Sequence, residues 1–170
     1  VFGEPTRWLA LQIEALRLSA VGDHEKALPL REEAFELAPA TAGTLDGVAF
    51  EWIADADARL GPVLEAIMNG GYYWVPFERI RAIRIAPPED LRDMVWAAAE
   101  IDWPNGGTGV ALVPSRYAGS ECAADKALSL ARSTIWEEPT AGVFTGLGQR
   151  ILATDTGEYP LLEIRAISLA

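Results

Sequence analysis

The spacing of apolar residues along the chain changes near residue 47. In residues 1–40, apolar side chains recur every three or four positions, which is typical of helices with one buried face. Gly22 and Asp23 interrupt this pattern, and Pro39 ends it. Residues 1–40 are therefore predicted to form two helices joined by a short turn.

Residues 48–170 follow a different pattern. Short apolar runs rich in aromatic and β-branched residues alternate with Gly, Pro and Asn, as in strands joined by tight turns. Asn69 and Gly70 separate two such runs and predict a hairpin, because both residues adopt positive φ at low cost. Residues 74–85 are expected to form one long strand, in which the apolar phase slips near Ala82 and predicts a bulge or a sharp bend.

Further elements are expected in the second half of the chain. Residues 89–96 are a candidate short helix, residues 128–136 form either a strand or a helix, and residues 149–154 and 160–169 form a closing hairpin. A curved, mainly antiparallel and barrel-like sheet with a few short helices accounts for this series of elements.

Together the two patterns predict an α+β protein with two domains. Residues 1–40 form the helical segment, residues 48–170 form a β-rich C-terminal domain, and the Thr-, Gly- and Ala-rich residues 40–47 link them. Residues 22–39 resemble the second half of a tetratricopeptide repeat, from its Gly-Asp turn to its closing proline. Because such repeats need neighbours to bury their apolar faces, we expect further helices to precede Val1.

The acidic composition and the single cysteine limit the kinds of partner the protein can bind and the cellular compartment it suits. The 170 residues carry a formal net charge of −11, and 50% of them are hydrophobic. The acidic excess argues against nucleic-acid binding, which depends on Lys and Arg, and against an anionic membrane surface. No apolar run approaches the roughly 20 residues needed to cross a bilayer. The single Cys122 can form no internal disulfide, which favours a cytoplasmic protein.

The motif Asp55-x-Asp57 allows two interpretations. A carboxylate pair at a strand end can hold a divalent metal ion against a nucleotide-sugar diphosphate, as in a metal-dependent glycosyl- or nucleotidyl-transferase. Alternatively, Asp55, Asp57 and Arg59 form a row of ion pairs on one face of an extended segment. The second interpretation is favoured, because the motif is short and follows a helical hairpin rather than a nucleotide-binding βαβ unit. No metal or cofactor is predicted.

Other candidate sites lack residues that their chemistry requires. His24 is the only histidine, and neither Ser115 nor Cys122 lies in a nucleophile-elbow sequence. The glycine-rich residues 142–148 are not followed by the Lys-Ser/Thr pair of a phosphate loop. The aromatic residues 72–74 suit either the core of a sheet or the centre of a protein interface.

Seven segments, in order along nearly the whole chain, resemble the ImpE family, also called SciE-type or TagJ proteins. These segments are VFGEPTRWLAL, FEWIADADARLGPVLEAI, YYWVPFERI, PEDLRDMVW, VALVPSRYAGSE, LARSTIW and GQRILATDTGEYPLLEIRAI. Members of the family are accessory components of bacterial type VI secretion systems.

The resemblance implies a non-enzymatic adaptor. Its partner would be the small, TssB-like subunit of the contractile sheath, bound through that subunit's N-terminal helix, with a link to sheath assembly or to recycling by a ClpV-type AAA+ ATPase. The family pattern implies a tetratricopeptide-like helical part and a β-rich part, and it transfers no catalytic residue. The residues that match its motifs have a possible interaction or structural role; they are Asp55, Asp57, Arg59, Trp74, Pro76 and Arg79.

Overall fold

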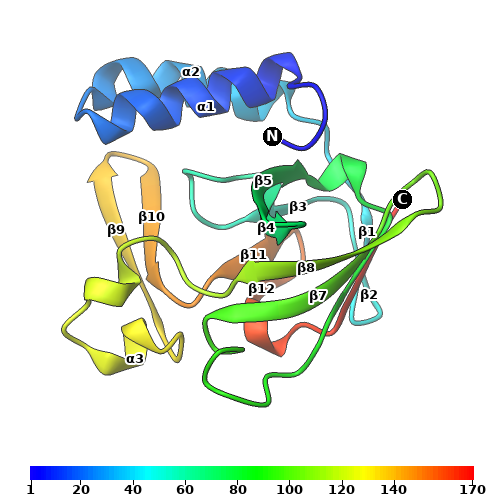
Figure 1. Ribbon diagram of the computed structural model, residues 1–170. Helices are drawn as coiled ribbons and strands as arrows, with labels where there is room; N and C mark the ends of the chain where they lie inside the picture. Colours follow the sequence, from blue (N-terminus) through cyan, green and yellow to red (C-terminus); the bar gives the residue numbers. More distant parts are fainter.

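A computed structural model describes the whole chain, residues 1–170. It begins with a helical hairpin formed by α1 (Arg7–Ala20) and α2 (His24–Leu37), which lie side by side across one end of the molecule (Figure 1). Gly22 has a φ of +83° in the turn between them, a conformation that favours glycine after a helix. The two predicted helices are confirmed. Neither is long and apolar enough to span a membrane.

Strands arranged in three antiparallel sheets make up most of the remaining chain. The largest sheet contains β1 (Gly43–Leu45), β2 (Val48–Phe50), β4 (Val63–Met68), β5 (Gly71–Pro76), β6 (Ala82–Ile85), β7 (Trp96–Asp102), β8 (Thr108–Pro114) and β13 (Ala166–Leu169). The smaller sheets contain β3 (Ile53–Asp55), β11 (Ile151–Thr154) and β12 (Gly157–Pro160), and β9 (Thr134–Thr140) and β10 (Val143–Gly148). The short helix α3 (Lys126–Ser129) precedes β9.

The largest sheet has the strand order β2-β1-β13-β6-β7-β8-β4-β5, so β2 and β5 form its two edges. In the three-stranded sheet, β11 lies between β12 and β3, although β3 is far away in sequence. One core of 23 buried residues lies between the eight-stranded and the three-stranded sheet. Ile83 and Ile101 come from the eight-stranded sheet, and Leu152 comes from the three-stranded sheet. The α+β class with mainly antiparallel sheets is thus confirmed.

A second, smaller core holds the helical hairpin against the sheets. Trp8 and Leu9 of α1 pack with Val63, Trp74 and Tyr117 from the β-rich part. Because these side chains are almost fully buried, separating the helices from the sheets would expose a large apolar area to water.

Hydrogen bonds reinforce this contact at a single backbone oxygen. The carbonyl of Ala58 accepts Gln12 Nε2 of α1 at 2.9 Å and Arg31 Nε of α2 at 2.9 Å. Both helices are therefore fixed to the loop that follows β3.

Residues 74–85 do not form the single strand, bulged or bent near Ala82, that the sequence predicts. Strand β5 ends at Pro76, a 3₁₀ turn covers Phe77–Arg79, and β6 starts at Ala82 in the middle of the same sheet. The slip in apolar phase therefore marks a break between two strands. Proline lacks the N–H that a continuing ladder requires, which explains the position of the break.

The structure differs from the sequence prediction in three other segments. Residues 90–95 form turns rather than a helix, and Asp93 accepts hydrogen bonds from the backbone of Glu89 and Asp90. Strand β11 pairs with β12 at Gly157–Pro160, whereas the rest of the expected second strand, residues 161–169, instead contains a 3₁₀ turn at Leu161–Glu163 and then β13 of the large sheet. Within the stretch expected to be a linker, residues 43–45 form β1 and pair with β13 and β2.

The hairpin predicted at Asn69 and Gly70 is confirmed. Both residues have positive φ, 51° and 76°, and connect β4 to β5. Residues 128–136, left open between helix and strand, contain the end of α3 and the start of β9.

Candidate functional site

The loop after β3 brings two buried carboxylates into the interior. Asp55 ends β3 with 4% of its surface exposed, and Asp57 is fully buried two residues later. The backbone N–H of Asp57 donates to Asp55 Oδ1 at 2.9 Å, and that of Arg59 donates to Asp57 Oδ1 at 2.8 Å. Each carboxylate therefore fixes the turn of the chain that follows it.

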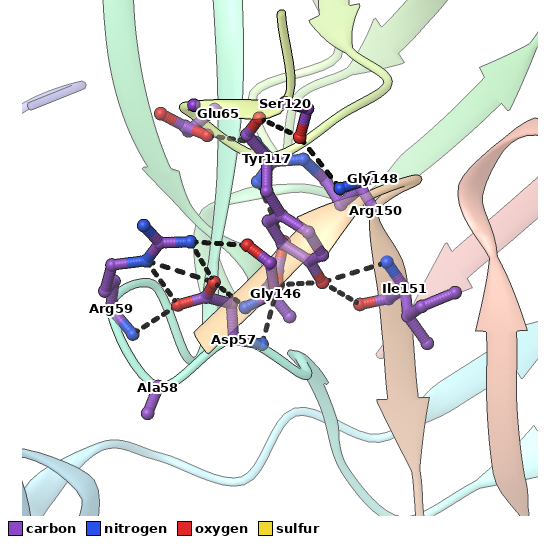
Figure 2. A network of polar contacts seen from close by, with 12 residues as sticks. Asp57, Ala58, Arg59, Glu65, Tyr117, Ser120, Gly146, Gly148, Arg150 and Ile151 are labelled. Atoms are coloured by element: carbon purple, nitrogen blue, oxygen red, sulfur yellow. Dashed lines mark hydrogen bonds and ion pairs between the residues drawn. The ribbon is translucent and has the colours of Figure 1, made fainter. Parts of the chain in front are cut away.

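Asp57 connects this loop to the β9–β10 hairpin. Arg59 donates to its carboxylate through Nε at 2.9 Å and Nη2 at 2.5 Å. The backbone N–H of Gly146 in β10 donates to Asp57 Oδ2 at 2.7 Å, while Arg59 Nη2 donates to the Gly146 carbonyl at 2.9 Å (Figure 2). Asp57, Arg59 and Gly146 thus form a closed ring of charged hydrogen bonds.

Asp55 belongs to a separate buried cluster around Arg150. Arg150 Nη1 donates to Asp55 Oδ2 at 2.8 Å, and the Tyr117 hydroxyl donates to Asp55 Oδ1 at 2.9 Å. Arg150 also pairs with Glu65 through Nη2 and donates Nε to the Pro114 carbonyl at 3.0 Å. Only 2% of the Arg150 surface is exposed. The cluster joins β4, the end of β8 and the start of β11.

The predicted ion-pair row is wrong in its arrangement. Asp57 pairs with Arg59, as predicted, but Asp55 pairs with Arg150 instead, and the three residues do not share one face of an extended segment. The reason is that Asp57 follows the end of β3, where the chain turns, so the alternation of a strand no longer applies.

Burial and charge oppose each other in this cluster. Burial raises the pKa of Asp55 to about 6, although the charge of Arg150 acts in the opposite direction. Burial disfavours the charged form of Arg150, but Asp55 and Glu65 outweigh this effect and raise its pKa. Burial, together with Asp55, raises the pKa of the Tyr117 hydroxyl, which stays protonated and donates to the carboxylate.

The arrangement does not suit a metal ion. No group of three or more His, Cys, Asp or Glu side chains in the chain is placed to hold one. Both aspartates already accept hydrogen bonds from an arginine and from backbone N–H groups. A cation between them would meet the guanidinium groups of Arg59 and Arg150, so the geometry gives no support to metal-dependent transfer chemistry.

A cavity of about 490 Å³ lies between α1 and these charged clusters. Ile13 and Leu16 of α1 line one wall, and Arg59, Glu65 and Arg150 line the other. Trp74 also borders it, 7% exposed, and donates its indole N–H to the Tyr72 hydroxyl at 2.8 Å.

Arg79 lies outside both clusters. It donates to the backbone carbonyls of Phe2 and Glu4 and so fixes the start of the chain. Pro76 ends β5 next to the 3₁₀ turn that carries Arg79. Of the residues singled out in the sequence, Asp57 and Arg59 therefore belong to one cluster and Asp55 to the neighbouring one. Trp74 lines the cavity beside these clusters, and Arg79 and Pro76 lie elsewhere.

Sequence reasoning missed Arg150, Tyr117 and Glu65. A local signal existed for Arg150, because it directly precedes strand β11, whose first three residues are apolar, and an arginine beside such a strand is rarely buried unless it is paired. Its partner could not be found this way, since Asp55 is 95 residues away.

A protein-family model and a bacterial relative both place this chain among similar proteins. The family model described as "ImpE protein" matches residues 47–168. The chain is 45% identical over 167 residues to "Type VI secretion system accessory component TagJ" of Pseudomonas aeruginosa. That alignment covers 98% of this chain and 58% of the relative.

A solved structure shows the same fold. The crystal structure of protein VPA1032 from Vibrio parahaemolyticus matches with a TM-score of 0.90 at 23% sequence identity. The match covers 100% of this chain and 64% of the other. The chain thus spans about three fifths of the length of both proteins.

Proposed function

The chain belongs to the ImpE family, and from this premise we propose that it is a non-enzymatic adaptor of a bacterial type VI secretion system. The observation that carries the proposal is the 45% identity, along 98% of this chain, to a protein named as an accessory component of that system. The buried clusters are consistent with a non-enzymatic role, because their carboxylates and arginines are engaged in ion pairs with one another.

The proposed partner is the small, TssB-like subunit of the contractile sheath, bound through its N-terminal helix. Through this contact the adaptor would act in sheath assembly or in recycling by a ClpV-type AAA+ ATPase, and both processes place it in the cytoplasm. An amphipathic helix docks through apolar residues at positions i, i+3, i+4 and i+7, so the adaptor must offer an exposed apolar surface.

One surface of the chain has this character. A cavity of about 430 Å³ lies where the end of α2 meets β3 and β10. Phe35, Trp52 and Phe144 line it and are 40%, 40% and 49% exposed. Exposed aromatic residues around a cavity are typical of the centre of a protein interface. The net charge of −11 favours a helix that carries Lys or Arg beside its apolar anchors.

Isothermal titration of the full-length protein with a peptide of the sheath subunit's N-terminal helix tests the proposal. We expect saturable binding that intact sheath subunit competes away. Replacing Phe144 by Ser should weaken binding at least tenfold, whereas Val110→Ser should not. Val110 is a matched control because it is also an exposed strand residue, at 76%, and lies on β8 away from this cavity. No heat and no competition would contradict the proposal.

A further inference from the structure

A cavity with basic walls lies on the other side of the β9–β10 hairpin. It has a volume of about 320 Å³ and is enclosed by the turn between α1 and α2 and by β10. Arg31, Arg59 and His24 line it, together with the hydroxyl residues Ser19 and Thr145. No Asp or Glu is among its lining residues, although acidic residues dominate the chain as a whole.

Arg31 is the unusual member of this cavity. Only 5% of its surface is exposed, and no carboxylate lies within 4 Å of its guanidinium, whereas a buried arginine normally has an acidic partner. It donates Nε to the Ala58 carbonyl at 2.9 Å and Nη2 to the Ser19 hydroxyl at 3.1 Å. Both partners are neutral, and burial lowers the pKa of Arg31 although the charge of Asp57 acts in the opposite direction.

Arg31 lines the cavity and keeps one nitrogen without a partner. Nη1 has no hydrogen-bond partner in the protein, yet it is not one of the polar atoms that are sealed from solvent. Arg59 is in the same situation: its Nε and Nη2 bond Asp57 and Gly146, and its Nη1 has no partner. Two guanidinium groups that line this cavity therefore each keep N–H donors that no protein group accepts.

We propose that this cavity binds a small oxyanion, a phosphate or a carboxylate group, held by Arg31 and Arg59. Guanidinium groups bind such anions through planar, often bidentate, charged hydrogen bonds, and the Ser19 and Thr145 hydroxyls can complete the shell of donors. The volume admits a small molecule of this class. His24, half-buried at the first position of α2, is a further lining residue of the site.

The position of the site gives the bound anion a structural effect. Ser19, His24 and Arg31 belong to the helical hairpin, whereas Arg59 and Thr145 belong to the β-rich part. An anion held by both arginines joins these two parts, so it binds the folded protein and raises its melting temperature. This inference does not depend on the proposed adaptor role and can fail without affecting it.

The test is a titration of the full-length protein with inorganic phosphate and, in a second arm, with a small dicarboxylate such as succinate. Melting temperature and heat of binding are measured, and sodium chloride at matched ionic strength is the reference. We expect at least one of the two anions to raise the melting temperature above the reference and to bind saturably. The arm that responds identifies the kind of oxyanion.

Three variants test whether the anion binds in this cavity. Arg31→Gln should weaken anion binding at least tenfold. His24→Glu should do the same by placing a carboxylate among the lining residues, and it preserves folding because acidic residues are favourable in the first turn of a helix. Lys26→Gln is the matched control: it changes the net charge equally, lies in the same turn of α2, is exposed and does not line the cavity.

Each outcome decides the inference. Binding that is lost in Arg31→Gln and His24→Glu but kept in Lys26→Gln supports it. A thermal response equal to that of sodium chloride overturns it, and so does an equal loss of binding in Lys26→Gln, because either result reduces the effect to general screening.

Discussion

Arg150 and Asp55, 95 residues apart in sequence, form an ion pair of 2.8 Å in which both side chains are at least 98% buried. Arg150 directly precedes β11, and Asp55 ends β3, the strand that pairs with β11. The pair therefore locks the register of two strands that no local signal brings together. Glu65 of β4 bonds the same guanidinium and extends the lock to the large sheet.

Removing Arg150 should be strongly destabilising. Arg150→Met leaves Asp55 and Glu65 buried or half-buried without a cation, and losing one partner of a buried ion pair costs about 3–5 kcal/mol. Urea denaturation at neutral pH measures the loss. Arg132→Met, at an exposed position, is the control and should stay within about 0.5 kcal/mol. Adding Asp55→Asn to Arg150→Met should recover part of the loss; an additive further loss would show that the two side chains are not coupled.

Asp55 should give the protein an unusual dependence of stability on pH. Its pKa rises from an ordinary 3.8 in the unfolded chain to about 6 in the folded protein, mainly through burial. Between these values the folded state binds the proton more tightly, so this contribution to stability is complete below 3.8 and is lost as pH rises through about 6.

The free energy of unfolding, measured from pH 4 to pH 8, should therefore fall more with rising pH in the wild type than in Asp55→Asn. The comparison with the variant removes the contributions of all other carboxylates. A carboxyl carbon titration by NMR locates the midpoint directly, and a midpoint near 4 would refute the prediction.

Gly146 should not tolerate a side chain. A Cβ at this position would lie 2.2 Å from Cε2 of the Tyr117 ring, and the ring would have to move away from Asp55. Overpacking of this kind costs about 1–3 kcal/mol. Gly107→Ala is the control, because its nearest neighbour is the flexible Asn105 side chain at 3.2 Å. Equal melting temperatures for the two variants would mean that the Tyr117 ring is not held in place.

Divalent cations should leave the melting temperature unchanged. Asp55 and Asp57 are occupied by arginines and backbone N–H groups, so Mg²⁺ or Mn²⁺ has no free carboxylate pair to bind. A ligand that binds only the folded state must raise the midpoint. A cation-specific increase that disappears in Asp57→Asn would reopen the transferase interpretation.

The parts of the fold that the sequence predicts are those set by near neighbours. The two helices follow from apolar spacing, and the hairpin at Asn69 and Gly70 follows from two residues that accept positive φ. The break after Pro76 does not follow from the sequence, because a bulge within one strand and a break between two strands produce the same change of apolar phase.

The candidate site was predictable only in part. Asp57 and Arg59 are two positions apart and their pairing is local, so the charge pattern predicts it. The partner of Asp55 is set by strand order, which depends on packing across the whole core and leaves no trace in the spacing of charges. Arg31 gave no signal at all, since an arginine on a predicted helix is expected to be solvated.

The carbonyl of Ala58 couples the motion of the helical hairpin to that of the loop after β3. This one oxygen accepts a hydrogen bond from each helix, and the two helices pack against each other, so releasing the hairpin from the sheets breaks both bonds. The hairpin and the loop that carries Asp57 should open and close as one cooperative unit, with a shared rate of amide hydrogen exchange. A protein that binds and displaces the helical hairpin would therefore also disturb the loop that carries Asp57 and Arg59. Binding at the surface would in this way change the buried ion pairs.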